Sequence, residues 1–220
     1  NWIPRIIKLE MARQLHFYRL ANTLRSQLSL PDLPSDRRLD DEKTEALVSE
    51  KVSQALPLKL IDVTDEFTNC ESKMVVNGLQ KSYIMLALPL PGLAGKIGAK
   101  QLDSEGSQLP RLGRELAGAA KLAGVKGVFH SDELPAYGIE SNNVENVRKA
   151  LELSENDGFV LCLAPLWQAE LALESVLLRA RAAWHRIPQE VRNVVIKKGA
   201  PEDGTTAPMR PLPGGARMYP

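Results

Sequence analysis

The stretch GVKGVFHSDELPAYGI, residues 124–139, is the feature that most constrains how this chain folds. Its apolar residues Val125, Val128 and Phe129 lie between glycines, and the chain then enters a polar run at residues 130–133 before Pro135. This pattern is typical of a short buried strand that ends in a polar turn. Helix-like segments flank it, over residues 109–123 and 141–153. In such helix–strand–helix units, residues at strand ends often meet ligands or partners.

Apolar runs and helical spacings alternate along the rest of the chain. The run YIMLALPL at residues 83–90 has the length of a strand and ends among prolines. Strands are also expected over residues 58–63 and 159–163, and helices over residues 4–28, 44–55, 64–79 and 167–184. This alternation predicts an α+β fold in which helices pack on a small sheet in two layers.

The predicted N-terminal helix carries an apolar stripe and several basic residues. The stripe consists of Ile7, Met11, Leu15, Tyr18, Leu24 and Leu28. We expect it to pack on a part of the protein that is absent or that lies later in the chain. The arginines on the other faces favour a solvated surface over an RNA-binding one. A charged, proline-containing linker follows at residues 30–43.

Composition excludes several functional classes. The net charge of +1 gives no general attraction to nucleic acids or membranes. No apolar run reaches the roughly 20 residues that span a bilayer, so a cytoplasmic protein without membrane contact is expected. Cys70 and Cys162 have no zinc-site spacing, and we expect buried thiols and no metal site. The spacing of Gly92, Gly95 and Gly98 matches no phosphate loop and indicates turns with positive φ.

The polar turn supplies the first set of candidate site residues. His130 with Asp132 and Glu133 suits a proton-transfer site, a metal site or a hydrogen-bonded turn, and the sparse constellation favours the turn. Ser131 has no triad context, and Tyr137 fits a wedge beneath the turn better than a platform for a stacked base. We therefore treat these five residues as polar-turn or interface candidates.

The C-terminal segment from residue 197 supplies a second set. It is rich in proline and glycine and has no apolar periodicity, which is typical of a flexible linker. Its hydrogen-bonding side chains also suit a loop held against a polar or phosphorylated partner. These side chains are Thr205, Thr206, Arg210, Arg217 and Tyr219.

Three segments together resemble a known family. FHSDELPAYGI, DGTTAPMRPLPGGARMYP and WIPRIIKLEMARQL are similar to the E subunit of archaeal glutamyl-tRNA(Gln) amidotransferases. The middle of the chain resembles the GAD domain, an insertion shared with bacterial-type aspartyl-tRNA synthetases. The resemblance implies a piece of a longer protein in which residues 1–57 and 197–220 belong to a cradle domain. Residues 58–196 would then form a two-layer, DCoH-like GAD insertion.

The resemblance also implies a reaction. The E subunit uses ATP and magnesium to phosphorylate the γ-carboxylate of glutamate on Glu-tRNA(Gln), and ammonia from the asparaginase-like D subunit displaces the phosphate. The D subunit, tRNA(Gln) and the rest of the E subunit are the implied partners. Because the family's acidic kinase cluster lies upstream, we expect this segment to bind no cofactor and to be inactive alone.

Within this resemblance, Arg210 and Arg217 are candidate contacts for ATP or for the phosphates of the tRNA acceptor end. Packing between the cradle and the insertion is the alternative role for them. Two other identities remain open: a stand-alone RNA- or protein-binding module, and the insertion domain of an aspartyl-tRNA synthetase. The hypothesis of an aspartyl-tRNA synthetase is weakened because the sequence contains no class II synthetase motif.

Overall fold

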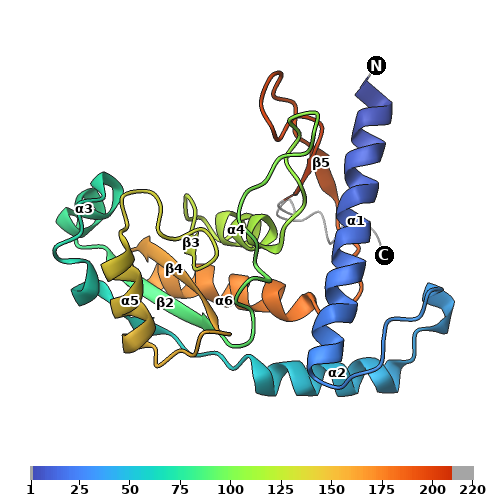
Figure 1. Ribbon diagram of the computed structural model, residues 1–220, viewed down its shortest axis with the longest axis horizontal. Coiled ribbons are helices and arrows are strands. Elements are labelled where there is room, and N and C mark those ends of the chain that lie inside the picture. Colours follow the sequence, from blue (N-terminus) through green and yellow to red (C-terminus); the bar gives the residue numbers. More distant parts are fainter. Residues whose placement is uncertain (1, 210–220) are drawn as a thin grey trace, which may run out of the picture.

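A four-stranded antiparallel sheet forms the centre of the molecule (Figure 1). The structure, a computed structural model, describes residues 2–209. The two long strands pair along their whole length, from Ile84 opposite Ala164 to Leu90 opposite Gly158. In sheet order the strands are β1 (Ile61–Asp62), β2 (Ile84–Leu90), β4 (Gly158–Ala164) and β3 (Phe129–His130).

Four helices contribute to the core on one side of this sheet. Leu86, Leu88 and Leu90 point to this side because alternate residues of a strand face opposite ways. They share one apolar core with Phe17 and Leu24 of the first helix. The helices are α1 (Trp2–Gln27), α2 (Glu42–Ala55), α4 (Leu112–Leu122) and α6 (Leu166–Ala182). Of these, α6 packs directly on β2 and β4, and α4 and α2 pack against α6.

Shorter elements cover the opposite face. Met85 and Ala87 of β2 pack there in a second apolar core with Phe67 and Val147. The sheet is therefore covered on both sides, which corrects the expectation of two layers. The sequences of β2 and β4 are continuous apolar runs, so both faces of these strands are apolar. The covering elements are the 3₁₀ helix η2 (Thr64–Phe67), α3 (Lys73–Gln80) and α5 (Ser141–Ala150).

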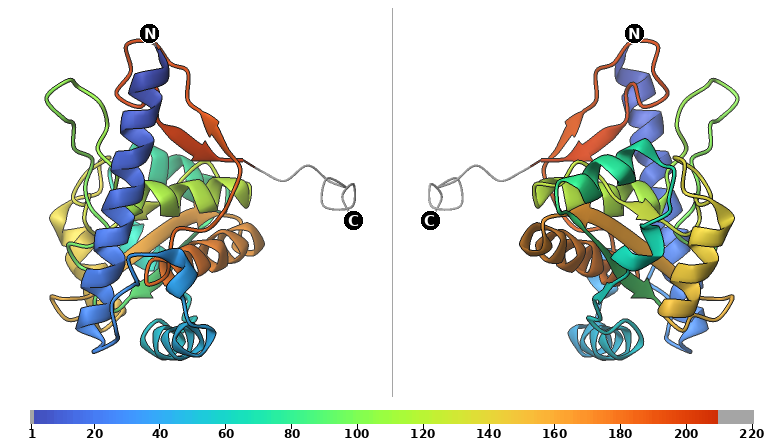
Figure 2. Two further views of the ribbon diagram at one scale, coloured as in Figure 1. Left: turned by 90° about the vertical axis from the view of Figure 1, so that its right-hand side faces the viewer. Right: turned by 90° about the vertical axis from the view of Figure 1, so that its left-hand side faces the viewer.

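The two ends of the described chain meet at one side of the molecule. Figure 2 shows the N-terminal half of α1 rising beyond the sheet, beside the ribbon formed by β5 (Arg192–Val194) and β6 (Thr206–Pro208). Arg5 Nε donates to the carbonyl of Asp203 at 3.1 Å, and Thr206 Oγ1 donates to Glu10 Oε2 at 2.9 Å. Segments almost 200 residues apart in sequence thus form one junction.

The charged linker after α1 is held in place by the helices around it. It contains a short 3₁₀ helix, η1 (Arg37–Leu39), capped by Asp36. Arg186 Nε donates to Asp40 at 2.7 Å, and Arg25 Nη2 donates to Glu45 Oε1 of α2 at 2.6 Å. Arg25 is completely buried. The arginines predicted to be solvated therefore include one that fastens α2 to α1.

The apolar stripe of α1 differs from the sequence prediction, and α6 leaves two of its leucines exposed. On α1, Ile7, Met11 and Leu15 are exposed, while Phe17, Leu20 and Leu24 are buried, because only the C-terminal half of the helix lies against α6 and the sheet. On α6, Leu171 and Leu178 are exposed. The buried side of α6 is built from smaller residues: Ala169, Ala172, Leu173, Val176, Leu177 and Ala180.

The predicted glycine turns are present, but two predicted elements are shorter or divided. Gly92, Gly95 and Gly98 all have positive φ, as their turn assignment predicts. The expected strand at residues 125–129 is reduced to β3, and the expected helix at residues 64–79 is divided into η2 and α3. Both cysteines are buried and free, and burial raises the pKa of Cys162 to about 12. Among residues 2–209, no helix is long and apolar enough to cross a bilayer.

Candidate functional site

The polar turn after β3 is built around a buried histidine. His130 is only 3% exposed, and its Nε2 lies 3.3 Å from Arg111 Nη1 at the start of α4. The same guanidinium nitrogen lies 2.7 Å from Glu133 Oε1. Burial lowers the pKa of His130 below its usual value, and the positive charge of Arg111 acts in the same direction. The carboxylates of Glu133, 3.5 Å from Nε2, and of Asp132 oppose this lowering of the pKa but do not outweigh it.

Gly113 permits this close packing. A Cβ at that position of α4 would lie 2.5 Å from His130 Nε2 and 2.8 Å from Arg111 Nη1. Both distances are shorter than a side-chain atom can tolerate. The first turn of α4 can approach the histidine only because the residue there is glycine.

Ser131 and Asp132 bind backbone groups of neighbouring segments. Ser131 Oγ accepts a hydrogen bond from Phe159 N of β4 at 3.0 Å. The carboxylate of Asp132 accepts from Gly95 N at 2.9 Å and from Gly98 N at 2.8 Å. The turn thereby fixes the glycine loop that follows β2.

Tyr137 lies at the outer side of the turn. Its ring packs at a tilt against Phe129, with centroids 5.8 Å apart, and its hydroxyl donates to Glu133 Oε2 at 3.3 Å. Partial burial and the nearby Glu133 carboxylate raise the pKa of the Tyr137 hydroxyl. The side chain is more than half exposed, so it borders the turn and does not fill the space beneath it.

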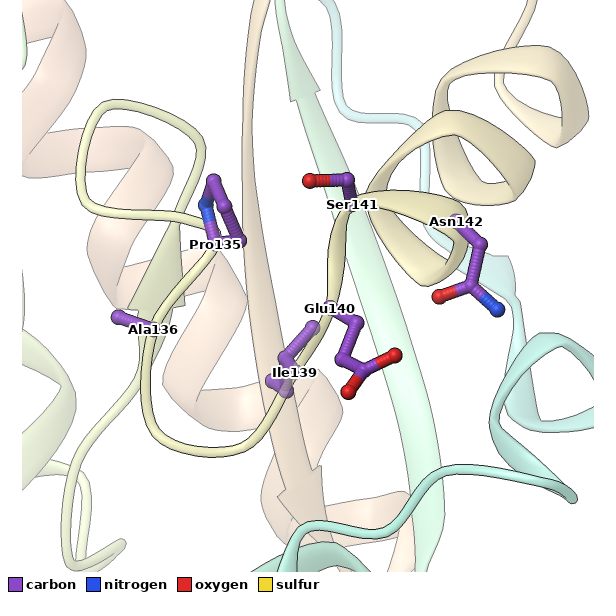
Figure 3. Close-up of a pocket in the computed structure, with 6 residues that line it drawn as sticks. All are labelled: Pro135, Ala136, Ile139, Glu140, Ser141 and Asn142. Carbon is purple, nitrogen blue, oxygen red and sulfur yellow. The ribbon is translucent and has the colours of Figure 1, made fainter.

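A surface hollow of about 480 Å³ lies beside the polar turn (Figure 3). Its six labelled residues run from the turn into the start of α5, where the side chain of Asn143 accepts a hydrogen bond from Glu140 N at 3.2 Å. Glu140 is its one charged lining residue among those described. The lining residues are Pro135, Ala136, Ile139, Glu140, Ser141 and Asn142.

The second candidate region is the junction between α1, α4, α6 and the β5–β6 ribbon. We name it the arginine cluster and define it as Glu10, Arg13, Arg114, Glu115, Arg179 and Arg192. At its centre, the buried carboxylate of Glu115 lies 3.3 Å from Arg13 Nη1 and 3.1 Å from Arg192 Nη2. Arg179 Nε is 4.0 Å from the same carboxylate. The guanidinium groups of Arg13 and Arg179 also lie over the ring of Phe17, 5.9 and 5.2 Å from its centroid.

Two of the predicted C-terminal residues belong to this junction. Thr205 Oγ1 accepts from Arg114 Nη2 at 2.7 Å, and Thr206 Oγ1 accepts from Arg192 Nε at 2.8 Å. Both threonines therefore contact arginines, although they lie far from the polar turn in sequence. Arg210 and Arg217, the candidate phosphate contacts, lie outside the described residues, as does Tyr219.

Sequence reasoning missed Arg111, Gly113 and Arg114, the residues that connect the two regions. Their signal was the segment LPRLGREL, in which two arginines three residues apart start a helix. Charged residues on a helix are usually solvated, so this spacing alone does not distinguish a buried arginine from an exposed one.

Comparison with known proteins identifies the family. No protein-family model matches the chain. The E subunits of the glutamyl-tRNA(Gln) amidotransferases of Methanopyrus kandleri and Pyrococcus furiosus are 39% and 40% identical to it over 220 residues, 100% of the chain. The protein of the same name from Sulfurisphaera tokodaii is 34% identical over 219 residues, 99% of the chain. The chain belongs to this E-subunit family. It spans about 30% of the length of these relatives.

The arginine cluster offers neither a metal-binding group nor a nucleotide-sized cavity among the described residues. Among residues 2–209, no group of three or more histidine, cysteine, aspartate or glutamate side chains is arranged to hold a metal ion. The cavity beside the arginine cluster, at about 20 Å³, is far smaller than a nucleotide. We therefore assign no step of magnesium or ATP chemistry to these residues of the E-subunit homologue.

Proposed function

We propose that this chain is part of an ATP-dependent amidotransferase that converts Glu-tRNA(Gln) to Gln-tRNA(Gln). The observation that carries the proposal is the match to E-subunit proteins along the full chain, at 34–40% identity. In this reaction the γ-carboxylate of tRNA-bound glutamate is phosphorylated, and ammonia displaces the phosphate. ATP, magnesium, the asparaginase-like D subunit and tRNA(Gln) are the implied cofactors and partners of the whole enzyme.

Within that enzyme, we assign this segment a positioning or docking role. Two features support this role. The hydrogen-bonding groups of the polar turn serve mainly to join β3, β4, α4 and the glycine loop. In addition, α1 contacts the segment that contains β6. This contact is expected if the two ends of the chain belong to one cradle domain and residues 58–196 form a GAD insertion in it.

The first test is ATP turnover by the isolated chain. We expect the purified 220-residue protein to hydrolyse no ATP in the presence of Glu-tRNA(Gln), because the carboxylates needed to hold magnesium are not among its described residues. Release of inorganic phosphate is the measurement, with the complete amidotransferase as the positive control. Phosphate release by the isolated chain that depends on Glu-tRNA(Gln) would contradict the positioning role.

The second test compares two substitutions in the intact complex. Arg217→Ala is expected to lower amidation more than His130→Ala does, because an arginine that contacts phosphate acts on the reaction directly. The buried His130 acts through packing, so its loss should appear mainly in stability. Amidation of Glu-tRNA(Gln) is measured together with the unfolding midpoint of each variant. The opposite order of activities would count against the assignment of Arg217.

A further inference from the structure

The charges of the arginine cluster do not balance. Four guanidinium groups, those of Arg13, Arg114, Arg179 and Arg192, converge on the two cluster carboxylates Glu10 and Glu115. A third carboxylate, Glu190 at the rim, lies 2.5 Å from Arg192 Nη1. Among the described residues, the cluster therefore has one positive charge more than it has carboxylates to pair with.

Arg114 carries the unpaired charge. Its hydrogen bond to Thr205 Oγ1 has a neutral acceptor, and no carboxylate of residues 2–209 lies within 4.0 Å of its guanidinium group. Burial is the largest cause that lowers the pKa of Arg114. The carboxylates of Glu115 and Glu202 oppose this shift, and the neighbouring Arg192 and Arg111 add to it. Arg114 is half-buried, and its nearest carboxylates act on it without direct contact. An anion in direct contact with its guanidinium group would therefore stabilise the folded protein.

A small cavity lies beside this arginine. Its volume is about 20 Å³, enough for one water-sized atom or group. Two of its lining residues have polar groups that lack a partner among the described residues. Arg111 Nε is buried without an acceptor among the described residues. Gln108 is 8% exposed, and its side-chain amide forms no hydrogen bond with residues 2–209. Arg13 and Arg114 also line the cavity, as do the carboxylates of Glu10 and Glu115.

We propose that this cavity is an oxyanion-binding site, in which one oxygen of a phosphate-like or carboxylate ligand binds between Arg114, Arg111 and Gln108. A water molecule fills the same volume and satisfies the amide, but it supplies no negative charge. An anionic oxygen supplies both the missing charge and an acceptor for the unused donors. The cavity takes a single oxygen, so the remainder of the ligand lies outside it.

The test is a titration of the 220-residue protein with sodium phosphate, sodium acetate and sodium chloride at equal ionic strength. Phosphate should raise the midpoint of thermal unfolding by roughly 3–6 °C at about ten times its dissociation constant, and the shift should follow a saturable binding curve. Isothermal titration calorimetry measures the same binding directly. A comparable shift with acetate identifies a carboxylate as an equally good ligand. An equal effect of chloride overturns the oxyanion assignment.

Matched variants separate binding from general salt effects, because phosphate also stabilises proteins non-specifically. Arg114→Gln should abolish the saturable shift, because it removes the guanidinium group that we propose to contact the anion. Arg19→Gln, at an exposed arginine of α1, should keep the full shift. Gln108→Leu should weaken phosphate binding and serves as the second variant if Arg114→Gln does not fold. An identical phosphate response in the wild type and in a folded Arg114→Gln or Gln108→Leu variant overturns the proposal.

Discussion

The polar turn and the arginine cluster are both rich in buried polar groups, but they differ in how their charges are matched. Each carboxylate of the turn has a partner, although His130 Nδ1 lacks one among the described residues. In the turn, Ser131 and Asp132 accept from backbone amides, and Glu133 accepts from Arg111 and Tyr137. In the cluster, the carboxylates are outnumbered and Gln108 has no partner among the described residues. This contrast indicates that a high density of buried polar residues is not by itself a sign of a ligand site. A stronger sign is an unequal number of cations and carboxylates in direct contact.

Arg111 belongs to both regions. Its Nη1 atom pairs with Glu133 in the turn, and its side chain also lines the cavity beside Arg114. The two regions are therefore in contact, and substitutions must be chosen to act on one of them at a time.

Glu115→Gln should cause the largest loss. Glu115 is the shared carboxylate of Arg13, Arg179 and Arg192, and its neutralisation leaves three buried cations with less countercharge. We expect the free energy of unfolding in urea to fall by about 3–5 kcal/mol.

The matched control for this substitution is Glu105→Gln, which breaks the exposed ion pair with Lys8. Exposed pairs contribute at most about 1 kcal/mol, so this variant should be close to wild type. Similar losses in the two variants would mean that water screens the arginine cluster as well as the surface. The ion pairs of the cluster would then contribute no more to stability than an exposed ion pair does.

Gly113→Ala should cause an intermediate loss. The added methyl group collides with His130 and Arg111, and overpacking of this kind costs about 1–3 kcal/mol. Gly118→Ala in the same helix is the control, because its Cβ would lie an ordinary 3.4 Å from Pro208. Alanine favours the helix, so that variant should gain up to about 1 kcal/mol. Urea unfolding measures both, and a stabilised Gly113→Ala variant would contradict the tight packing of the turn.

Lowering the pH should cause the smallest loss. Burial holds the pKa of His130 below 6.5 in the folded protein, so as the pH falls through 6.5 the unfolded chain binds more protons. Stability therefore decreases, by at most about 1.4 kcal/mol between roughly pH 7.5 and 5.5 from this residue.

His130→Gln should remove that part of the pH dependence. His16, whose pKa is also lowered by burial, contributes in the same direction, and His16→Gln is the control that retains the part due to His130. The measurement is the free energy of unfolding in urea at the two pH values. An unchanged pH dependence in His130→Gln would show that the pKa of His130 is the same in the folded protein as in the unfolded chain.

The long elements of this fold could be predicted from sequence because each has a strong local signal. The continuous apolar run of β2 and the proline-initiated α1 both lie within a residue or two of their expected ranges. The strand expected at residues 125–129 was too long because only Phe129 and His130 reach β4 for pairing. Pairing at a sheet edge depends on where a neighbouring strand lies, and periodicity does not contain that information.

The candidate site was less predictable. The turn residues His130 to Glu133 could be singled out because polar residues follow an apolar run directly. Burial of Arg13, Arg179 and Arg192 could not be predicted, because their partner Glu115 lies from 64 to 102 residues away in the chain. An arginine on a helix is predicted to be exposed unless a distant carboxylate is known to face it.

The full-length pairing of β2 with β4 specifies a single register for the two strands during folding. A shift of either strand by a single residue would exchange the two sides of the sheet. Met85 and Ala87 would then face the alanine-lined side of α6, and Leu86 and Leu88 would face Phe67. Because the two coverings differ in shape, neither would fit the exchanged side chains, and the ladder tolerates only the observed alignment.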